Sequence, residues 1–582
     1  MYHIAFTSKK SIGRLQGYNW KNFVFRAGPY SEWFHPSAAR AQAFRVSRFV
    51  AGLQESDIFD LSSLRSLLIV GYAREVFGGS LRRQTMNALL IYPEWPDTYW
   101  SFKHALPFEG KRSLYPPLGL LTVASLLPAN WTKRLVDTNI RPLTDADLDW
   151  ADVAMLSGML IHKEELIQIL DRCRARGLRT VIGGPVASSA PELQQHADHV
   201  VVGEAEEIVP GLAEELERGA AKPIYQAPER PQLELTPLPD LSLIDLNSYS
   251  AMAIQYSRGC PFNCEFCDII EIYGRKPRTK APQQVIAELE QLRERRWHGP
   301  IFIVDDNFIG NKVKVKEMLP ELAAWNNSQR HPFTFYTEAS LNLADDNDLL
   351  AMMQKARFTR VFLGIETPVE ESLKEAQKFQ NTRRSLLESV QRIQNYGMEV
   401  MAGFIVGFDS DPEEIFDKQV EFIQESAIPM AMVGLLCALP NTQLYRRLQR
   451  EGRLLNEDHS GDNMDLRLNF VPKMNPQKLI DGYRSILKRI YHPDAYYDRV
   501  RRYLAQAPPG LRRTPRRRSD YMALARSIVK QGILGDFRWS YWKFFLAAAT
   551  RYRYAFDRAI TFAIMGHHFH TLTQIVCDTD TD

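Results

Sequence analysis

Residues 258–269 read RGCPFNCEFCDI and place Cys260, Cys264 and Cys267 at a C-x3-C-x2-C spacing, directly after an apolar strand pattern. Thiolates are the preferred ligands of iron–sulfur clusters and of zinc. A closed structural zinc site needs four ligands, and no fourth cysteine or histidine lies close by. Three thiolates on a four-iron cluster leave one iron free. The loop therefore predicts an iron–sulfur cluster, with a zinc loop or a chance grouping of buried cysteines as the alternatives.

The residues after the loop alternate between strand and helix patterns as far as about residue 450. Besides the strand that leads into the loop, five strands are expected, at 301–307, 333–340, 360–367, 401–408 and 430–439. Six strands with helices between them predict a partial (β/α)6 barrel over 245–450. Function in such barrels lies at the carboxyl ends of the strands. The polar residues gather there: Asp305, Asp306, Asn307, Glu338, Glu366, Gly407 and Asp409.

The segment 86–235 predicts a doubly wound parallel sheet, so the fold class is α/β. Apolar strands such as NALLIYP alternate with helix patterns such as LGLLTVASLLP. Ligands of such sheets bind outside the carboxyl ends of the strands. Three predicted strand ends carry candidate residues: Asp137 and Asn139, then Gly183, Gly184 and Pro185, then Gly203 and Glu204. Tight turns are the alternative explanation for each glycine. A linker over 226–248 joins this unit to the barrel.

The cysteine loop and the barrel pattern resemble the radical SAM superfamily. Phe266 stands just before the last cysteine, and VDDNFIGN, FYTEAS, FLGIETP and GFIVGFD fall at the next four strand ends. The resemblance implies a 4Fe-4S cluster on Cys260, Cys264 and Cys267, whose free iron binds S-adenosylmethionine. It also implies contacts of that cofactor with residues near Asp305, Glu338, Gly364, Glu366 and Gly403. VDDN stands where relatives often have a glycine-glycine-glutamate motif.

A parallel sheet placed directly before such a barrel resembles the cobalamin-binding class of the superfamily. YPPLGLLTVASLLP, VDTNI, IGGP and VVGEAE carry this resemblance. The class implies a Rossmann-like cobalamin domain whose strand ends face those of the barrel, so that both cofactors share one cavity. The Asp-x-His-x-x-Gly loop is absent, which implies cobalamin without a histidine ligand. A vestigial or nucleotide-binding sheet is the alternative. The domain's four histidines all lack the context of that loop: His104, His162, His196 and His199.

The C-terminal region, 451–582, is predicted to be helical and is dense in Trp, Tyr and Phe after residue 521. It resembles the extra region of a branch that contains bacteriochlorophyll side-chain methylases, and the wider class includes hopanoid methylases and an anaerobic cyclase. The resemblance implies methylation of an unactivated carbon in a large hydrophobic substrate, a tetrapyrrole or a polycyclic lipid. The alternatives are a radical cyclisation or rearrangement without methyl transfer, and a cobalamin- or cluster-binding sensor. Residues 537–569 suggest either a lid over the substrate or ordinary helix packing.

The bulk composition bounds the partners and the compartment. The 582 residues carry a formal charge of only +3, which gives no signature of nucleic-acid binding. Six cysteines without a disulfide framework, and no leader or bilayer-length apolar run, predict a cytoplasmic protein. Seven arginines between 501 and 518 indicate a solvated linker or a peripheral membrane contact. The chemistry calls for a flavodoxin- or ferredoxin-like electron donor, and residues 1–85 form an extension of unknown role.

Overall fold

The computed structural model describes residues 85–455, 460–506 and 518–578 of the chain. These residues belong to the second of two compact units, Gln84–Asp582. All but the last residue of the predicted extension over 1–85, and most of the arginine-rich stretch between 501 and 518, lie outside the described residues. No helix in the described ranges is both long enough and apolar enough to cross a membrane.

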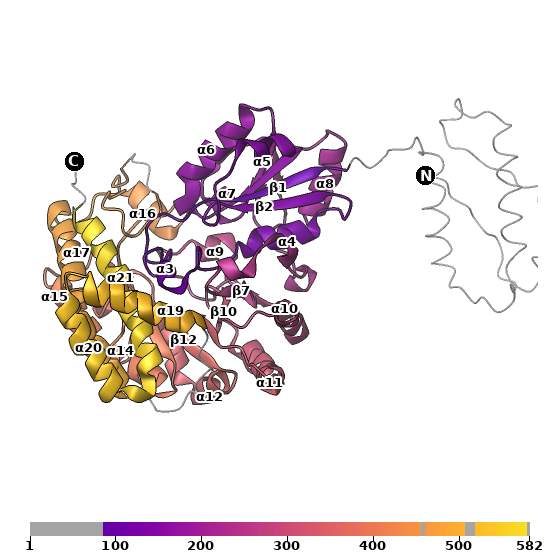
Figure 1. Cartoon of the computed structure of the whole chain (residues 1–582). Coiled ribbons are helices and arrows are strands. Elements are labelled where there is room, and N and C mark those ends of the chain that lie inside the picture. Colours follow the sequence, from indigo (N-terminus) through magenta and orange to yellow (C-terminus); the bar gives the residue numbers. More distant parts are fainter. Residues whose placement is uncertain (1–84, 456–459, 507–517, 579–582) are drawn as a thin grey trace, which may run out of the picture. The chain divides into compact units, whose positions relative to one another are not determined.

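The first sheet has six parallel strands in the order β2-β1-β3-β4-β5-β6. Its core lies on both faces, because Leu89 and Ile91 of β1 pack to one side while Ala88 and Leu90 pack to the other. Figure 1 shows helices above and below this sheet. The strands are β1 (Asn87–Tyr92), β2 (Thr132–Asp137), β3 (Val153–Ser157), β4 (Arg179–Gly183), β5 (His199–Val202) and β6 (Ile224–Gln226), and the helices are α4 (Leu118–Leu126), α5 (Asp145–Trp150), α6 (Lys163–Arg174), α7 (Pro185–Ser189) and α8 (Val209–Glu217).

The second sheet is the partial barrel, with six parallel strands in the order β14-β13-β12-β11-β10-β7. The α/β fold class predicted from the sequence is confirmed, since both sheets are wholly parallel and separated in the chain as expected. The strands are β7 (Met252–Ile254), β10 (Ile301–Ile303), β11 (Phe335–Ala339), β12 (Phe358–Glu366), β13 (Glu399–Val406) and β14 (Met430–Leu435), and the helices are α10 (Pro282–Glu294), α11 (Lys312–Ser328), α12 (Asn347–Lys355), α13 (Glu370–Glu375), α14 (Leu386–Asn395) and α15 (Ile415–Glu425).

The cysteine loop leaves the first barrel strand through a small antiparallel ribbon of β8 (Ser257–Arg258) and β9 (Arg278–Thr279). Gly259 follows β8 with a φ of 95°. A Cβ at this position would lie 2.8 Å from the carbonyl oxygen of Gly274, so only glycine fits. The chain therefore turns sharply between the ribbon and the first cysteine.

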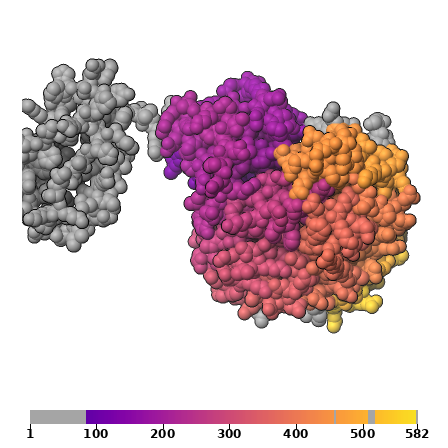
Figure 2. Space-filling view, turned by 180° about the vertical axis from the view of Figure 1, so that it is seen from behind, coloured from indigo at the N-terminus to yellow at the C-terminus, as the bar shows by residue number. Residues whose placement is uncertain are grey.

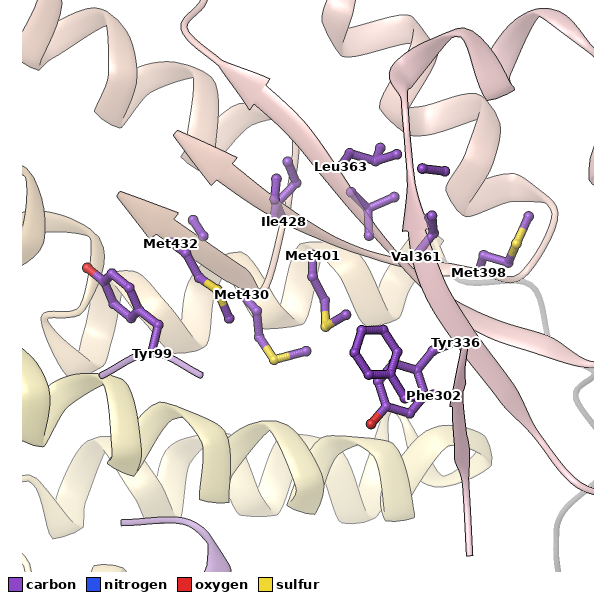
Figure 3. Packing of buried hydrophobic residues seen from close by; sticks show 14 of the residues in the cluster. Tyr99, Phe302, Tyr336, Val361, Leu363, Met398, Met401, Ile428, Met430 and Met432 are labelled. Carbon is purple, nitrogen blue, oxygen red and sulfur yellow. The ribbon is translucent and has the colours of Figure 1, made fainter. Parts of the chain in front are cut away.

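The C-terminal helices pack along one flank of the barrel. Figure 3 shows Met401, Met430 and Met432 on the face of the strands that is turned toward these helices. The segment before α3 (Leu106–Glu109) joins the same core, because the rings of Tyr99 and Phe569 lie 5.8 Å apart. The helices are α16 (Gln443–Arg450), α17 (Pro476–Ile490), α18 (Pro493–Gln506), α19 (Arg518–Ser527), α20 (Arg538–Thr550) and α21 (Phe556–Asp578), with a π-helical turn at Ile528–Ile533 and the short α3 (Leu106–Glu109) near the start of the chain.

Candidate functional site

The carboxyl ends of the two sheets face each other across one cavity of about 880 Å³. Tyr92 and Gly203 line it from the first sheet, and Val304 and Gly403 line it from the second. This confirms the expectation that both sheets present their strand ends to a shared cavity. Figure 2 shows the two domains, indigo to magenta and magenta to orange, as one continuous surface from behind. The predicted site residues that line the cavity are Gly183, Gly184, Pro185, Gly203, Glu204, Cys260, Cys264, Phe266, Cys267, Glu338, Gly364, Glu366 and Gly403.

Three predicted site residues lie outside the lining: Asp137, Asn139 and Asp305. Asp137 accepts hydrogen bonds from the Tyr249 hydroxyl at 2.9 Å and from the Asn139 side-chain amide at 2.7 Å. Asp305 is fully buried and accepts from the backbone N–H groups of Tyr256 and Ser257 at 2.8 Å each. Both carboxylates thus fix the chain around the first barrel strand, and their part in cofactor binding stays a prediction.

All three cysteines of the loop reach the cavity. Burial raises the pKa of the Cys260 thiol and raises that of the Cys267 thiol well above its usual range. The Asn307 side-chain amide lies 3.5 Å from the Cys260 sulfur, and the Gln380 amide lies 3.6 Å from the Cys264 sulfur. Among the described residues, no three His, Cys, Asp or Glu side chains converge on the position of a single metal ion. A closed zinc site requires such convergence.

The loop is held from outside by Arg447 of α16. Its guanidinium donates to both carboxylate oxygens of Glu265, at 2.7 and 3.1 Å, and pairs with Asp409 at 3.0 Å. The backbone of Glu265 also bonds to Ala376 at 3.0 Å and to Leu444 at 2.9 Å. Because Glu265 stands between Cys264 and Cys267, these bonds fix the loop before any cluster binds.

Acidic side chains form the wall of the cavity beside the cysteines. Burial, reinforced by the charges of Asp305 and Asp268, raises the pKa of Asp306 to about 7. Burial and then the charges of Asp306 and Asp305 raise the pKa of Glu338 to about 8. The Oδ2 atom of Asp306 is buried without a hydrogen-bond partner in the described part of the chain. The buried carboxyl groups of this wall lack a full set of hydrogen-bond partners among the described residues, so the wall suits a cationic ligand.

Lys378 and Gln380 enter the site from a segment that sequence reasoning did not single out. Lys378 is buried, forms an ion pair with Glu366, and places its ammonium 5.8 Å from the centre of the Phe266 ring. The segment follows α13 and not a strand, and it carries neither cysteine nor glycine patterns. A single sequence therefore held no signal for either residue.

Glu204 has a second role besides lining the cavity. Its carboxylate pairs with Arg258 at 2.6 Å and with Arg278 at 2.6 Å, both on the ribbon that leads into the cysteine loop. Glu206 pairs with Arg258 as well, at 2.8 Å. All four side chains are largely buried. This ionic clamp joins the turn after β5 of the first domain to the barrel.

The rest of the cavity wall is apolar and aromatic. Trp100 packs on Phe362 of β12 with ring centroids 4.9 Å apart, and Tyr115 stacks on Phe302 of β10 at 5.1 Å. In each pair, the first residue lies between β1 and α4 of the N-terminal domain and the second lies on a barrel strand. None of residues 537–569 lines the cavity, so the structure does not support a lid over it. Phe544, Phe562 and Phe569 are buried in the core, and ordinary helix packing accounts for these three rings.

Three family models match this chain. A model of the B12 binding domain matches residues 112–213, one of the radical SAM superfamily matches residues 254–423, and one of a domain of unknown function (DUF4070) matches residues 442–582. The chain is 42% identical over 496 residues to an uncharacterized methyltransferase of Synechocystis sp., covering 84% of this chain and 92% of the relative. It is 34% identical over 502 residues to the hopanoid C-2 methylase of Rhodopseudomonas palustris, covering 83% and 93%.

More distant relatives and solved structures agree with these matches. A bacteriochlorophyllide d C-8(2)-methyltransferase of Chlorobaculum tepidum is 26% identical over 404 residues, covering 65% of this chain and 87% of the relative. The cobalamin-dependent S-adenosylmethionine radical enzyme OxsB, solved with aqua-cobalamin and S-adenosylmethionine, superposes with a TM-score of 0.57 at 14% identity, covering 86% and 82%. The methyltransferase TsrM from Kitasatospora setae, solved with cobalamin and a [4Fe-4S] cluster, gives 0.55 at 13% identity, covering 77% and 99%.

The fold and the shared cavity define a radical SAM enzyme that also binds cobalamin. The chain belongs to the family of cobalamin-dependent radical SAM methylases, and it is a methyltransferase. Its cofactors are a 4Fe-4S cluster, S-adenosylmethionine and cobalamin.

The residues of the cavity fit all three groups. The three thiols and the amides beside them suit a cluster. The acidic wall with the unpartnered oxygen of Asp306 suits the ammonium and sulfonium charges of S-adenosylmethionine. A Cβ at Gly203 would meet only open space, whereas one at Gly184 would lie 2.3 Å from the Ser157 hydroxyl. The backbone at Gly203 is therefore open to a large planar ligand, whereas close packing restricts position 184 to glycine. No histidine of the described residues lines the cavity.

Proposed function

We propose that this enzyme transfers a methyl group to an unactivated carbon of a polycyclic lipid of the hopanoid class. The observation that carries the proposal is the single cavity in which the cysteine loop, the acidic wall and the aromatic pairs meet. A relative that is 34% identical over 93% of its own length is a hopanoid C-2 methylase, which supports this substrate class over a tetrapyrrole. The apolar part of the cavity supports a hydrophobic ligand.

The chain's own residues bind, orient and shield the reacting groups. When bound, the cluster with S-adenosylmethionine supplies a radical and cobalamin supplies a carrier for the methyl group. Asn307 and Gln380 donate hydrogen bonds to cysteine sulfurs and so hold two of the thiolates in place. Asp306 and Glu338 line the cavity, and a cationic ligand beside them would favour their charged forms. The pairs Trp100–Phe362 and Tyr115–Phe302 would keep water away from a reactive radical.

The reaction requires one-electron reduction of the cluster. We therefore propose a flavodoxin- or ferredoxin-like protein as the electron donor, and the cytoplasm as the compartment. The six cysteines without a disulfide framework support a reducing compartment.

The test is an anaerobic incubation of the reconstituted full chain with methyl-labelled S-adenosylmethionine, a low-potential reductant and a hopanoid. Transfer of the label to the hopanoid, together with release of 5′-deoxyadenosine, is the expected result. Deoxyadenosine without labelled product from a hopanoid or a tetrapyrrole would indicate a cyclase or rearrangement enzyme. Label in the tetrapyrrole alone would refute the lipid assignment. If no 5′-deoxyadenosine forms under any condition, the protein would instead be a cobalamin- or cluster-binding sensor.

A further inference from the structure

We propose that one surface of the C-terminal region docks on an anionic phospholipid membrane. This hairpin surface is formed by α19, the π-helical turn and α20, which lie beside α21 in yellow in Figure 1. Half of the exposed large hydrophobic side chains of the described residues fall between Tyr521 and Tyr554. This inference concerns a surface outside the cavity and does not depend on the proposed reaction. Binding of the protein to a membrane can be measured without any substrate.

Helix α20 is apolar on both of its faces. Its inner face packs into the core through Tyr541, Phe544 and Ala548. Trp539, Trp542 and Leu546 recur at helical spacing on the outer side and are 72%, 37% and 65% exposed. A surface helix of a globular protein ordinarily carries polar and charged residues on that side. The packing of the fold explains the inner face of α20 but gives no reason for the outer one.

The turn before α20 continues the same apolar surface. Ile533 and Leu534 are 57% and 72% exposed at the end of the π-helical turn. The indole N–H of Trp542 donates to the carbonyl of Gly532 at 2.9 Å, which holds the turn against α20. Two further exposed apolar side chains extend the surface: Val529 within the π-helical turn and Met522 on α19.

The charge of this segment is strongly one-sided. Residues 518–554 contain seven Lys and Arg, two Asp and no Glu. Arg526 is used within the fold, because it donates to the carbonyl of Phe108 at 3.0 Å and so attaches α19 to α3. Arg538 and Lys543 stand beside the two tryptophans, are exposed, and have no ion-pair partner in the described part of the chain. These two cations are available to an anionic partner.

Exposed tryptophans flanked by cations match the chemistry of an anionic bilayer surface. Trp rings favour the headgroup level, apolar side chains bury in the acyl boundary, and each nearby Lys or Arg adds attraction to anionic lipids. A second copy of the chain fits less well. A symmetric self-contact through this surface would bring two net-positive segments face to face.

The test is flotation of the full-length reconstituted enzyme with phosphatidylcholine vesicles, with and without phosphatidylglycerol, in the absence of substrate. We expect binding to the anionic vesicles that weakens as salt is added. The double variants Trp539→Ser/Leu546→Ser and Arg538→Glu/Lys543→Glu should each lower the partition coefficient at least about tenfold. The control Val313→Ser removes an equally exposed apolar side chain from α11 and should bind like the wild type.

Iron content and melting temperature verify that each variant is folded. Failure of the wild type to bind anionic vesicles would overturn the proposal, and so would equal binding by the Trp539→Ser/Leu546→Ser variant. Light scattering gives an independent check. A concentration-dependent dimer that this variant loses would assign the surface to a second copy and would also overturn the proposal. Each of these results is independent of whether the enzyme methylates a hopanoid.

Discussion

Cys264 is the residue whose loss should separate the two bound cofactors. Its thiol lines the cavity on the barrel side, whereas the open backbone at Gly203 lies on the side of the first sheet. Cys264→Ala should therefore lose most of the roughly four irons per chain and keep its cobalamin. Iron analysis and the absorption spectrum of the anaerobically reconstituted protein measure both. The control is Cys577→Ala on α21, outside the cavity. Full iron content in the Cys264 variant would refute the ligand assignment.

Gln380 should tune the cluster without being one of its ligands. Its amide lies 3.6 Å from the Cys264 sulfur, and a hydrogen bond to a thiolate favours the more negative, reduced cluster. Gln380→Leu should therefore lower the reduction potential by on the order of 50 mV, because a loss of about 1.4 kcal/mol corresponds to about 59 mV for one electron.

A potentiometric titration followed by electron paramagnetic resonance measures this shift. Gln354→Leu, an exposed glutamine on α12, serves as the control and should leave the potential unchanged. An unchanged or raised potential in Gln380→Leu would show that the amide does not contact the thiolate of the loaded enzyme.

Glu338 should make the ligand-free enzyme less stable as the pH rises. Burial, then the charges of Asp306 and Asp305, raises its pKa from 4.5 to about 8. Between those values the folded protein keeps a proton that the unfolded chain has lost, so stability falls across this pH range. Glu338→Gln removes the effect and should raise the melting temperature by on the order of 2 °C at about pH 9, with almost no gain at about pH 5.

Melting curves of the ligand-free protein at both pH values provide the measurement, with the exposed Glu371→Gln on α13 as control. The same variant should bind S-adenosylmethionine more weakly, because it has lost a negative charge beside the cysteines. If the variant is more stable but binds S-adenosylmethionine more weakly, the carboxylate serves function at the expense of stability. If its melting temperature falls at pH 9, the carboxylate instead contributes to the fold.

At the scale of elements, the strand and helix order was readable because each parallel strand is a short apolar run followed by polar or glycine residues. Each of the six barrel strands overlaps the segment expected for it, and three of them begin one or two residues earlier. What those strand-end residues do was harder to read. Glu204 lies just after β5, where a residue that contacts a ligand is expected. Its ion-pair partners are Arg258 and Arg278, which lie more than fifty residues further along the sequence. Pairing across such a separation leaves no local pattern in a single sequence.

The ionic clamp at Glu204 should be costly to break. Glu204→Gln leaves two largely buried guanidinium groups without their charge partner, which should lower the free energy of unfolding by about 3 kcal/mol. Glu214→Gln is the matched control on α8, because Glu214 pairs with Arg218 at the surface and should cost less than about 1 kcal/mol. Denaturant unfolding compares the two variants. Equal small losses would show that the clamp does not hold the domains.

At the scale of the whole molecule, the cavity exists only because two sheets from separate stretches of sequence meet. The sequence predicted each sheet, and resemblance predicted that they share a cavity. The contacts that bring the sheets together were beyond prediction, because they depend on single pairs such as Trp100 with Phe362 and Tyr115 with Phe302. The packing of α21 against the barrel was hidden for the same reason: its aromatic residues suggest a lid and a core equally.

The residues that line the cavity run from Tyr92 to Asn463, and β1 begins at Asn87. A chain that starts at Met86 therefore contains every described residue of the site and the whole of both sheets. We expect this shortened protein to retain its iron, its cobalamin and its production of 5′-deoxyadenosine within about twofold of the full chain, since it keeps every described residue that lines the cavity. A shortened protein that starts at Ala88 inside β1 is the control and should be unstable, because it deletes Asn87, whose backbone N–H and side chain bond to Asp152 and Trp150. Loss of either cofactor from the Met86 protein would show that residues 1–85 take part in the site.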